Sequence, residues 1–274
     1  PKCSANILKK ECERQMELVI DANGEKIRQV KRKPVLINYS LKGNKSKFSK
    51  IPDTFDFELI ERINNFKIDS WYPKNTLPKG DKTSDPFSVG ITKTYQFYTK
   101  RNLIIISKLY EIINRKNFPK KLKFHLLLIL TSFIQRNGTL ANRFVINKHN
   151  PRGRINGPFS GTLYIPPLVV EQNIFNLFKE KTLDILKEIQ NNYNEGISTI
   201  QTSSSSNIPQ ILDNSIDYIF TDPPFGSNLM YSELNFIAES WLKLFTNNKN
   251  EAIVNKTQKK ELFEYQELME KCFK

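Results

Sequence analysis

The most informative part of this 274-residue chain is the run Ile216-Asp217-Tyr218-Ile219-Phe220-Thr221, followed directly by Asp222-Pro223-Pro224-Phe225-Gly226. β-Branched and aromatic residues predominate in the first run, which predicts a strand. The two prolines after it fix φ and remove backbone donors, so we expect the strand to end in a rigid loop. In α/β sheets, loops at the carboxyl ends of strands carry the ligand sites.

The residue types of this loop suit one kind of chemistry. The exocyclic amine of adenine or cytosine is a poor nucleophile because its lone pair is delocalised into the ring. The Asp222 carboxylate and the Pro223 carbonyl can each accept one of its N–H groups, which favours a tetrahedral nitrogen. Pro224 stiffens the loop, and Phe225 offers a flat face for a base extruded from a duplex. The alternative is that Asp-Pro-Pro merely ends the strand, because both residue types are common in loops.

Together with its neighbours, this loop resembles a known family. Residues 221–226, then Tyr231-Ser232-Glu233-Leu234-Asn235 and Glu239-x-Trp241-Leu242, are similar to the amino-group-specific DNA methyltransferases, which make N6-methyladenine or N4-methylcytosine. Residues 80–86, 90–92, 99–103 and 160–164 are similar to a subset of DNA methylases. The resemblance implies S-adenosylmethionine as the cofactor and DNA as the substrate, with a restriction endonuclease as a candidate partner.

The binding site of the methyl donor is less well defined by the sequence. Related enzymes bind S-adenosylmethionine on a glycine-rich loop after a strand, and this chain contains no G-x-G. Residues 85–90 look like such a loop, but they lack a preceding apolar strand and the second glycine. The cofactor-binding candidates are Asp222, and Thr202 and Ser203 after a strand expected at 197–201. In the methylases that the chain resembles, the donor loop precedes a zinc ribbon, so we expect the chain to be a segment that begins downstream of that loop.

The formal net charge of +14 predicts a polyanionic partner. Lysine and arginine are dense between residues 26 and 50, and basic side chains alternate with glycines between 143 and 161. A basic background spread over the whole surface is the alternative. The candidate nucleic-acid contacts are Lys31, Arg32, Lys33, Arg143, Arg152, Arg154 and Tyr231.

Cysteine content and hydropathy exclude several other classes. The three cysteines form neither a disulfide framework nor a C-x-x-C pair. Cys3 could belong to one half of a zinc ribbon, but one thiolate cannot hold zinc, so we expect no metal. Neither a signal peptide nor an apolar run long enough to span a membrane is present. These features favour the cytoplasm.

The expected fold class is α/β, with a partial Rossmann-like S-adenosylmethionine-dependent methyltransferase sheet preceded by a mostly helical basic region. We divide the chain into a basic arm or ribbon remnant at 1–50, a helical and loop-rich region with possible DNA recognition at 51–165, and a partial catalytic domain at 166–274. A short strand is expected at 34–41 and loops at 67–98 and 138–162. Helices are expected at 55–66, 100–115, 119–136, 168–192, 231–246 and 258–272.

Some of these helices carry more specific expectations. The apolar stripe of 55–66 is expected in the core, residues 122–133 are expected to be buried nearly all round, and Pro166-Pro167 is expected to open the helix at 168. The side chains of Tyr231, Glu233 and Asn235 could face the pocket, although ordinary capping and solvation is the slightly favoured interpretation.

The sequence therefore predicts methyl transfer from S-adenosylmethionine to adenine N6 or cytosine N4 in DNA, with doubtful competence for these 274 residues alone. One alternative is methylation of guanine N2 in ribosomal RNA, for which similar D-P-P-F or D-P-P-Y loops exist. The other is a non-catalytic DNA-binding fragment of a methylase.

Overall fold

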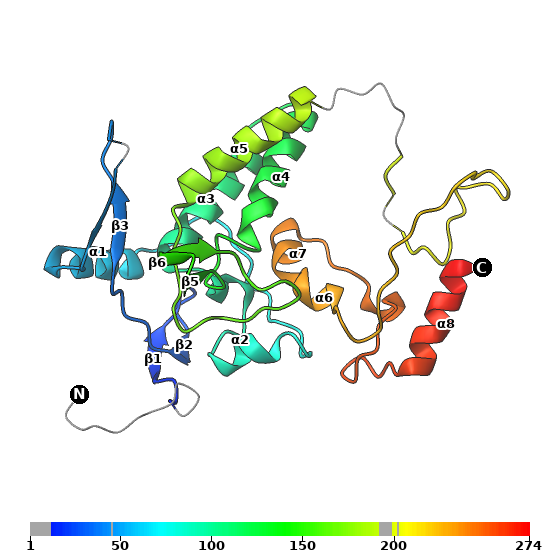
Figure 1. Ribbon diagram of the computed structural model, residues 1–274, viewed down its shortest axis with the longest axis horizontal. Coiled ribbons are helices and arrows are strands. Elements are labelled where there is room, and N and C mark those ends of the chain that lie inside the picture. Colours follow the sequence, from blue (N-terminus) through cyan, green and yellow to red (C-terminus); the bar gives the residue numbers. More distant parts are fainter. Residues whose placement is uncertain (1–11, 45, 192–198, 202) are drawn as a thin grey trace.

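The structure is a computed structural model that describes residues 12–44, 46–191, 199–201 and 203–274 (Figure 1). Its elements are, in chain order, β1 (Met16–Ile20), β2 (Lys26–Val30), β3 (Ile37–Ser40), β4 (Lys47–Lys50), α1 (Thr54–Asn65), α2 (Ser84–Ser88), η2 (Thr94–Phe97), α3 (Lys100–Arg115), α4 (Lys120–Ile134), β5 (Arg143–Asn147), β6 (Asn150–Asn156), α5 (Ile174–Asn191), α6 (Tyr231–Leu234), α7 (Phe236–Leu242), η3 (Asn248–Asn250) and α8 (Leu262–Phe273).

Three antiparallel hairpins make up the sheets of the described residues: β1 with β2, β3 with β4, and β5 with β6. The turn of the first hairpin is anchored in the core. The Asp21 carboxylate accepts hydrogen bonds from Tyr95 and Gln96, and Tyr72 Oη donates to the Ala22 carbonyl at 2.9 Å. The chain therefore has mixed α and β structure, while the Rossmann-like sheet expected from the sequence stays a prediction.

The hydrophobic core lies where α3, α4 and α5 meet the segment before α3 and the later helix α7 (Figure 1). Phe97, Ile106, Phe133 and Trp241 are all fully buried there. Residues 67–98, expected as a loop, contain only the short elements α2 and η2, yet they contribute much of this core. Irregular chain can be buried because its polar groups find partners, as where Leu77 N donates to the Thr92 carbonyl at 2.9 Å.

The expected helices at 100–115 and 119–136 are confirmed as α3 and α4, and that at 55–66 as α1. The expectations about their burial are wrong in two places. None of the α1 residues is buried, and Phe55 is 63% exposed. In α4, Leu122, Phe124 and Leu128 are exposed, because the core and α5 cover only one side of the helix.

Two later segments also differ from expectation. Residues 143–156, expected within a loop, form the hairpin β5–β6. The fourth expected helix begins at Ile174 rather than at 168, because the side chain of Asn173 accepts hydrogen bonds from the backbone N–H groups of Phe175 and Asn176. This arrangement is that of a helix N-cap.

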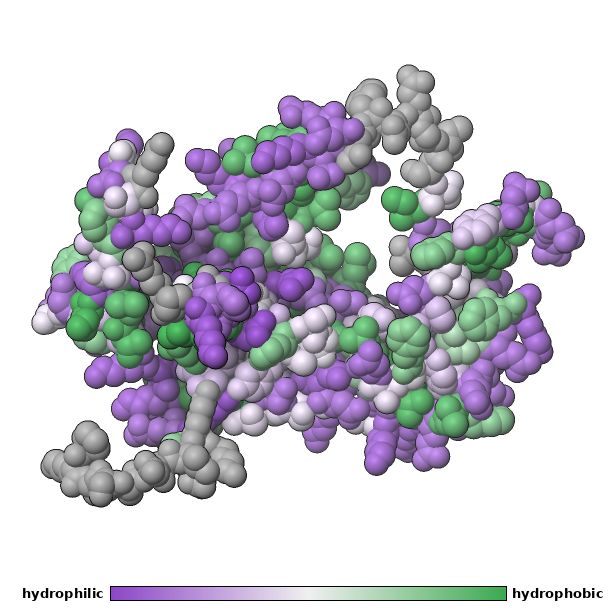
Figure 2. All heavy atoms as spheres, in the orientation of Figure 1, coloured by the Kyte–Doolittle hydropathy of each residue, from purple (hydrophilic) through white to green (hydrophobic). Residues whose placement is uncertain are grey.

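Residues 216–221, expected as a strand, have no regular secondary structure in the described chain. Ile219 and Phe220 are 74% and 84% exposed, and Figure 2 shows hydrophobic side chains reaching the surface in this part of the molecule. A strand forms only when a neighbour pairs with its N–H and C=O groups, and no described segment lies against this run as such a neighbour. Of the strand expected at 197–201, residues 197 and 198 lie outside the described chain, and 199–201 are irregular.

Candidate functional site

The loop at 222–226 presents two side chains to solvent. Asp222 is exposed, and Phe225 is 74% exposed. Two hydrogen bonds anchor the loop backbone. Tyr265 Oη donates to the Pro224 carbonyl at 2.7 Å, and Val254 N donates to the Gly226 carbonyl at 3.3 Å. Gly226 has φ +65°, which a residue with a Cβ rarely adopts. The carboxylate and the aromatic ring are thus carried on an anchored turn.

The segment that follows the loop is fixed to the helical core through α7. Trp241 is fully buried, and its Nε1 donates to Tyr98 Oη at 2.9 Å. Burial raises the pKa of Tyr98, so its hydroxyl keeps its proton and donates it to the Ile134 carbonyl at 2.7 Å while the oxygen accepts the bond from Trp241. Beside it, Thr94 Oγ1 donates to Ser240 Oγ at 3.1 Å. The loop is therefore mounted on a rigid support.

Glu233 of α6 is a buried acid that links three segments of the chain. Only 3% of the residue is exposed. Its Oε2 accepts from Lys82 N at 2.7 Å, and its Oε1 accepts from Asn255 Nδ2 at 3.0 Å. A Cβ at Gly80 would overlap with the Glu233 carboxyl group. The absence of a side chain at Gly80 therefore lets the carboxylate reach the backbone of the 80–83 turn.

A polar network continues from α6 into residues 248–260. Ser232 Oγ donates to Glu251 Oε2 at 2.6 Å, and the Lys260 ammonium donates to the carbonyls of Asn248 and Glu251, each at 2.6 Å. Burial lowers the pKa of Lys260, although Glu251 acts in the opposite direction. Backbone bonds in both directions join Asn255 and Lys260. This network fixes the segment that supports Gly226 and Tyr265.

Stretches of sequence that are far apart in the chain converge on this support. The turn at 80–83 contacts Glu233, as described above. A Cβ at Gly161 would come within 2.8 Å of Leu229 Cδ2, so residues 160–162 lie against the connection between the loop and α6. The structure thus brings together the loop and two of the upstream stretches that carry the sequence resemblance.

The cofactor-binding candidates are not assembled into an enclosed site. Asp222 and Ser203 are both exposed, and Ser203 Oγ accepts from Gln201 Nε2 at 2.8 Å. Thr202 lies outside the described residues. Residues 85–90 belong to α2 and the turn after it, where Pro86 is buried. Because protein sites usually bury most of a small ligand, Asp222 and Ser203 alone do not fit a group as large as S-adenosylmethionine.

The first group of nucleic-acid candidates lies just after β2. Lys31 and Lys33 are exposed. Arg32 is half-buried between them, and its Nη2 is buried without a hydrogen-bond partner in the described part of the chain. Burial and, to a lesser degree, the charge of Arg14 lower the pKa of Arg32. Since this atom is enclosed by the protein, Lys31 and Lys33 are the side chains of this group that a phosphate can reach.

The three arginine candidates of the second group lie on the hairpin β5–β6, and Tyr231 lies on α6. The Arg143 guanidinium lies 3.6 Å from the centre of the Phe159 ring, and its Nε donates to the Gly157 carbonyl at 3.0 Å. Arg143 thus has structural partners. Arg154 is exposed, whereas the side chain of Arg152 lies outside the described set. Tyr231 is 44% exposed at the start of α6.

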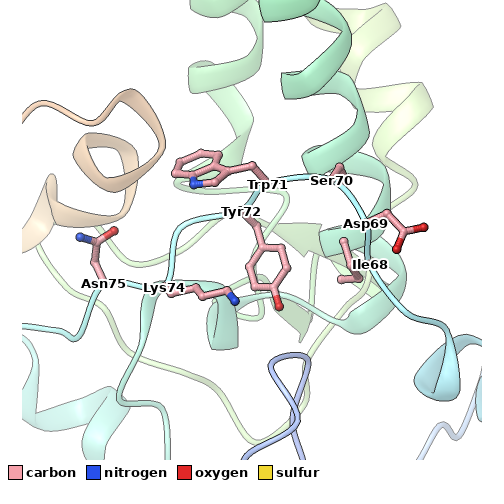
Figure 3. Close-up of a pocket in the computed structure, with 7 residues that line it drawn as sticks. All are labelled: Ile68, Asp69, Ser70, Trp71, Tyr72, Lys74 and Asn75. Atoms are coloured by element: carbon pink, nitrogen blue, oxygen red, sulfur yellow. The ribbon is translucent and has the colours of Figure 1, made fainter.

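A cavity of about 620 Å³ lies along residues 68–75, away in sequence from every predicted site residue (Figure 3). The Trp71 ring faces it, and the Lys243 ammonium lies 4.1 Å from the centre of that ring. Trp71 also packs edge-on against Trp241 at 5.9 Å between ring centres. The Trp71 ring therefore belongs to the aromatic cluster that holds α7.

Sequence reasoning missed Tyr265, and it slightly favoured a capping role for Glu233. No spacing rule connects Tyr265 with Pro224 or Glu233 with Lys82. A glycine at position 80 and an acid at 233 within two family-like stretches were the only available signals.

Within the described ranges, no helix is long and apolar enough to cross a membrane, and no group of three or more His, Cys, Asp or Glu residues could hold a metal ion. Cys3, the candidate zinc-ribbon residue, lies outside these ranges. Comparison of the chain with models of protein families, with curated proteins and with solved structures found no significant match.

Proposed function

We propose that this protein takes part in methyl transfer from S-adenosylmethionine to the exocyclic amine of adenine (N6) or cytosine (N4) in DNA. The observation that carries the proposal is the anchored loop at 222–226, with Asp222 and Phe225 both exposed on it. An enzyme that acts on an extruded base needs a polar group for the amine and a flat surface for the ring, both on rigid backbone.

Three residues of the loop contact the base in this proposal. Asp222 and the carbonyl of Pro223 accept the two N–H groups of the amine and direct its lone pair outward. Phe225 stacks on the face of the same base. Asp222 is a catalytic residue in this scheme because it contacts the reacting nitrogen, whereas Glu233 supports the loop from within the core.

DNA is the proposed substrate because the chain carries a formal charge of +14 and exposes Lys31 and Lys33 just after β2 and Arg154 on β6. S-adenosylmethionine supplies the methyl group when bound. Since Asp222 and Ser203 alone do not fit the cofactor, further residues must complete its site.

Methyl incorporation tests the proposal directly. The protein is incubated with S-adenosylmethionine labelled in the methyl group and with duplex DNA, and the digested nucleosides are separated by mass. We expect label in N6-methyladenine or N4-methylcytosine, and its loss in Asp222→Ala with DNA affinity retained. Asp217→Ala is the matched control, because this acid is also exposed but precedes the loop. An active Asp222→Ala protein would refute the assigned mechanism.

The same experiment separates the two alternatives. Label in N2-methylguanine of ribosomal RNA, without label in DNA, would favour the RNA methyltransferase. The non-catalytic alternative is favoured by the open arrangement around Asp222 and Ser203. It predicts no heat of S-adenosylmethionine binding in calorimetry, while duplex DNA still binds with a steep dependence on salt.

A further inference from the structure

Tyr265 makes a contact with the 222–226 loop that the proposed chemistry has not used. Its hydroxyl donates to the Pro224 carbonyl at 2.7 Å across 41 residues of sequence. The ring is half-buried, and it lies in the first turns of α8. The start of this helix is fixed by a capping box, in which Glu261 N donates to Glu264 Oε2 at 2.9 Å. The hydroxyl is therefore held in place by a defined helix terminus.

The geometry of the peptide chain gives this contact a specific effect. Between the carbonyl of Pro223 and the Cα of Phe225, both peptide bonds are planar, and the ring of Pro224 fixes φ. The only soft main-chain torsion in that stretch is ψ of Pro224. This torsion also determines the direction of the Pro224 carbonyl. A hydrogen bond to that carbonyl thus fixes the one free rotation between the Pro223 carbonyl and the backbone of Phe225.

We propose that Tyr265 is a positioning residue that locks ψ of Pro224, and so sets the orientation of the Pro223 carbonyl relative to the backbone that carries the Phe225 ring. The inference rests on the proposed function, in which these two groups bind the amine and the ring face of one base. A base is rigid and planar, so its amine and its stacked face have a fixed relation. The loop must match that relation for the nitrogen to point at the methyl group.

The second backbone contact of the loop cannot fix ψ of Pro224. Val254 N donates to the Gly226 carbonyl at 3.3 Å, which fixes the far end of the turn beyond Phe225. The torsions of Phe225 itself separate that contact from Pro224. The Val254 contact therefore limits where the loop ends, whereas the Tyr265 contact limits how the Pro223 carbonyl faces the backbone that carries Phe225.

The first measurement needs neither DNA nor cofactor. Backbone amide order parameters are measured by NMR for Phe225 and Gly226 in the wild-type protein and in Tyr265→Phe, which keeps the ring and removes only the hydroxyl. We expect a fall at these two amides from about 0.85, typical of rigid backbone, to below about 0.6. Tyr218→Phe is the matched control, since its ring is 79% exposed. Unchanged order parameters in Tyr265→Phe overturn the proposal.

The second measurement is the rate of methyl transfer. In Tyr265→Phe we expect kcat to fall about 10–100-fold, because a misplacement of about 1 Å can cost a factor of that size, while KM for DNA stays within about twofold of wild type. An equal kcat overturns the proposal, and so does a loss confined to KM. A wild-type protein that methylates no nucleic acid overturns the proposed function and the catalytic part of this inference, whereas the order parameters still decide whether Tyr265 holds the loop.

Discussion

Replacement of Glu233 is the most direct test of how the site is supported. Glu233→Ala removes an acceptor from two donors, Lys82 N at 2.7 Å and Asn255 Nδ2 at 3.0 Å. A buried donor without a partner costs about 1–3 kcal/mol. Water can reach the half-buried Lys82 N–H more easily than the buried Asn255 amide, so the first loss is the smaller one. We therefore expect the free energy of unfolding to fall by about 2–4 kcal/mol. Glu233→Gln keeps one acceptor and should lose about 1–2 kcal/mol.

The assay is urea unfolding, with the midpoint and slope measured for each variant. Glu267→Ala on the exposed side of α8 is the control, and it should change stability by less than about 0.5 kcal/mol. A double-mutant cycle with Gly80→Ala sharpens the test. The Cβ at position 80 should be costly beside Glu233 and nearly neutral in Glu233→Ala, because the group with which it overlaps is then absent.

Two outcomes would refute the reasoning. A loss below about 1 kcal/mol in Glu233→Ala would mean that the carboxylate does not link the three segments. Additive effects of Gly80→Ala and Glu233→Ala would mean that the turn at 80–83 does not contact this side chain.

Three further expectations follow from the core, the first hairpin and the basic surface. Trp241→Ala should cost about 3–5 kcal/mol in thermal unfolding, because it empties a fully buried site and removes the donor to Tyr98. Burial raises the pKa of Asp21, but the hydrogen bonds to its carboxylate, that from Tyr95 foremost, outweigh burial and hold the pKa below its ordinary value. Asp21 therefore contributes to the free energy of unfolding above about pH 4, and this contribution is lost at lower pH. In Asp21→Asn, the free energy of unfolding should depend less on pH over that range. Replacing Lys31 and Lys33 by Ala should reduce the slope of log affinity for duplex DNA against log salt by about 0.9 for each phosphate that these side chains neutralise.

Each of these expectations has a control and a contrary result. Leu244→Ala, at a 69% exposed position, should leave the thermal midpoint almost unchanged, and an equal loss there would remove the argument from burial. The argument for Asp21 fails if wild type and Asp21→Asn lose stability in parallel below about pH 4. Lys271→Ala on α8 is the charge-matched control for Lys31→Ala and Lys33→Ala made singly, and an equal change of slope would indicate a charge effect without a defined contact.

The local structure that sequence could predict is that which depends on neighbours in the chain. Asp53 caps α1 through its own backbone and side-chain contacts with Asp56, a near neighbour in the chain. Periodicity likewise located α3 and α4 within a few residues. Such features need no knowledge of distant segments, so propensity and spacing suffice.

What sequence could not predict depends on partners elsewhere. The helix expected at 231–246 is divided at Asn235 and ends at Leu242, where Lys243 takes a left-handed conformation with φ 60°. The apolar pattern of 216–221 is the same with or without a neighbouring strand, so the pattern could not show that no described strand pairs with it. The buried role of Glu233 likewise depends on a turn 151 residues earlier.

The burial of Trp241 has a consequence for how the chain is joined. The exposed segment at 216–221 connects α5 to the site covalently, but α7 is held by its contacts with Tyr98, Thr94 and the aromatic cluster. A chain cleaved within that segment should therefore keep both pieces associated, as two fragments that complement each other. The covalent connection through 216–221 is thus not needed to keep the 222–226 loop on the helical core, because the buried Trp241 side chain holds α7 there.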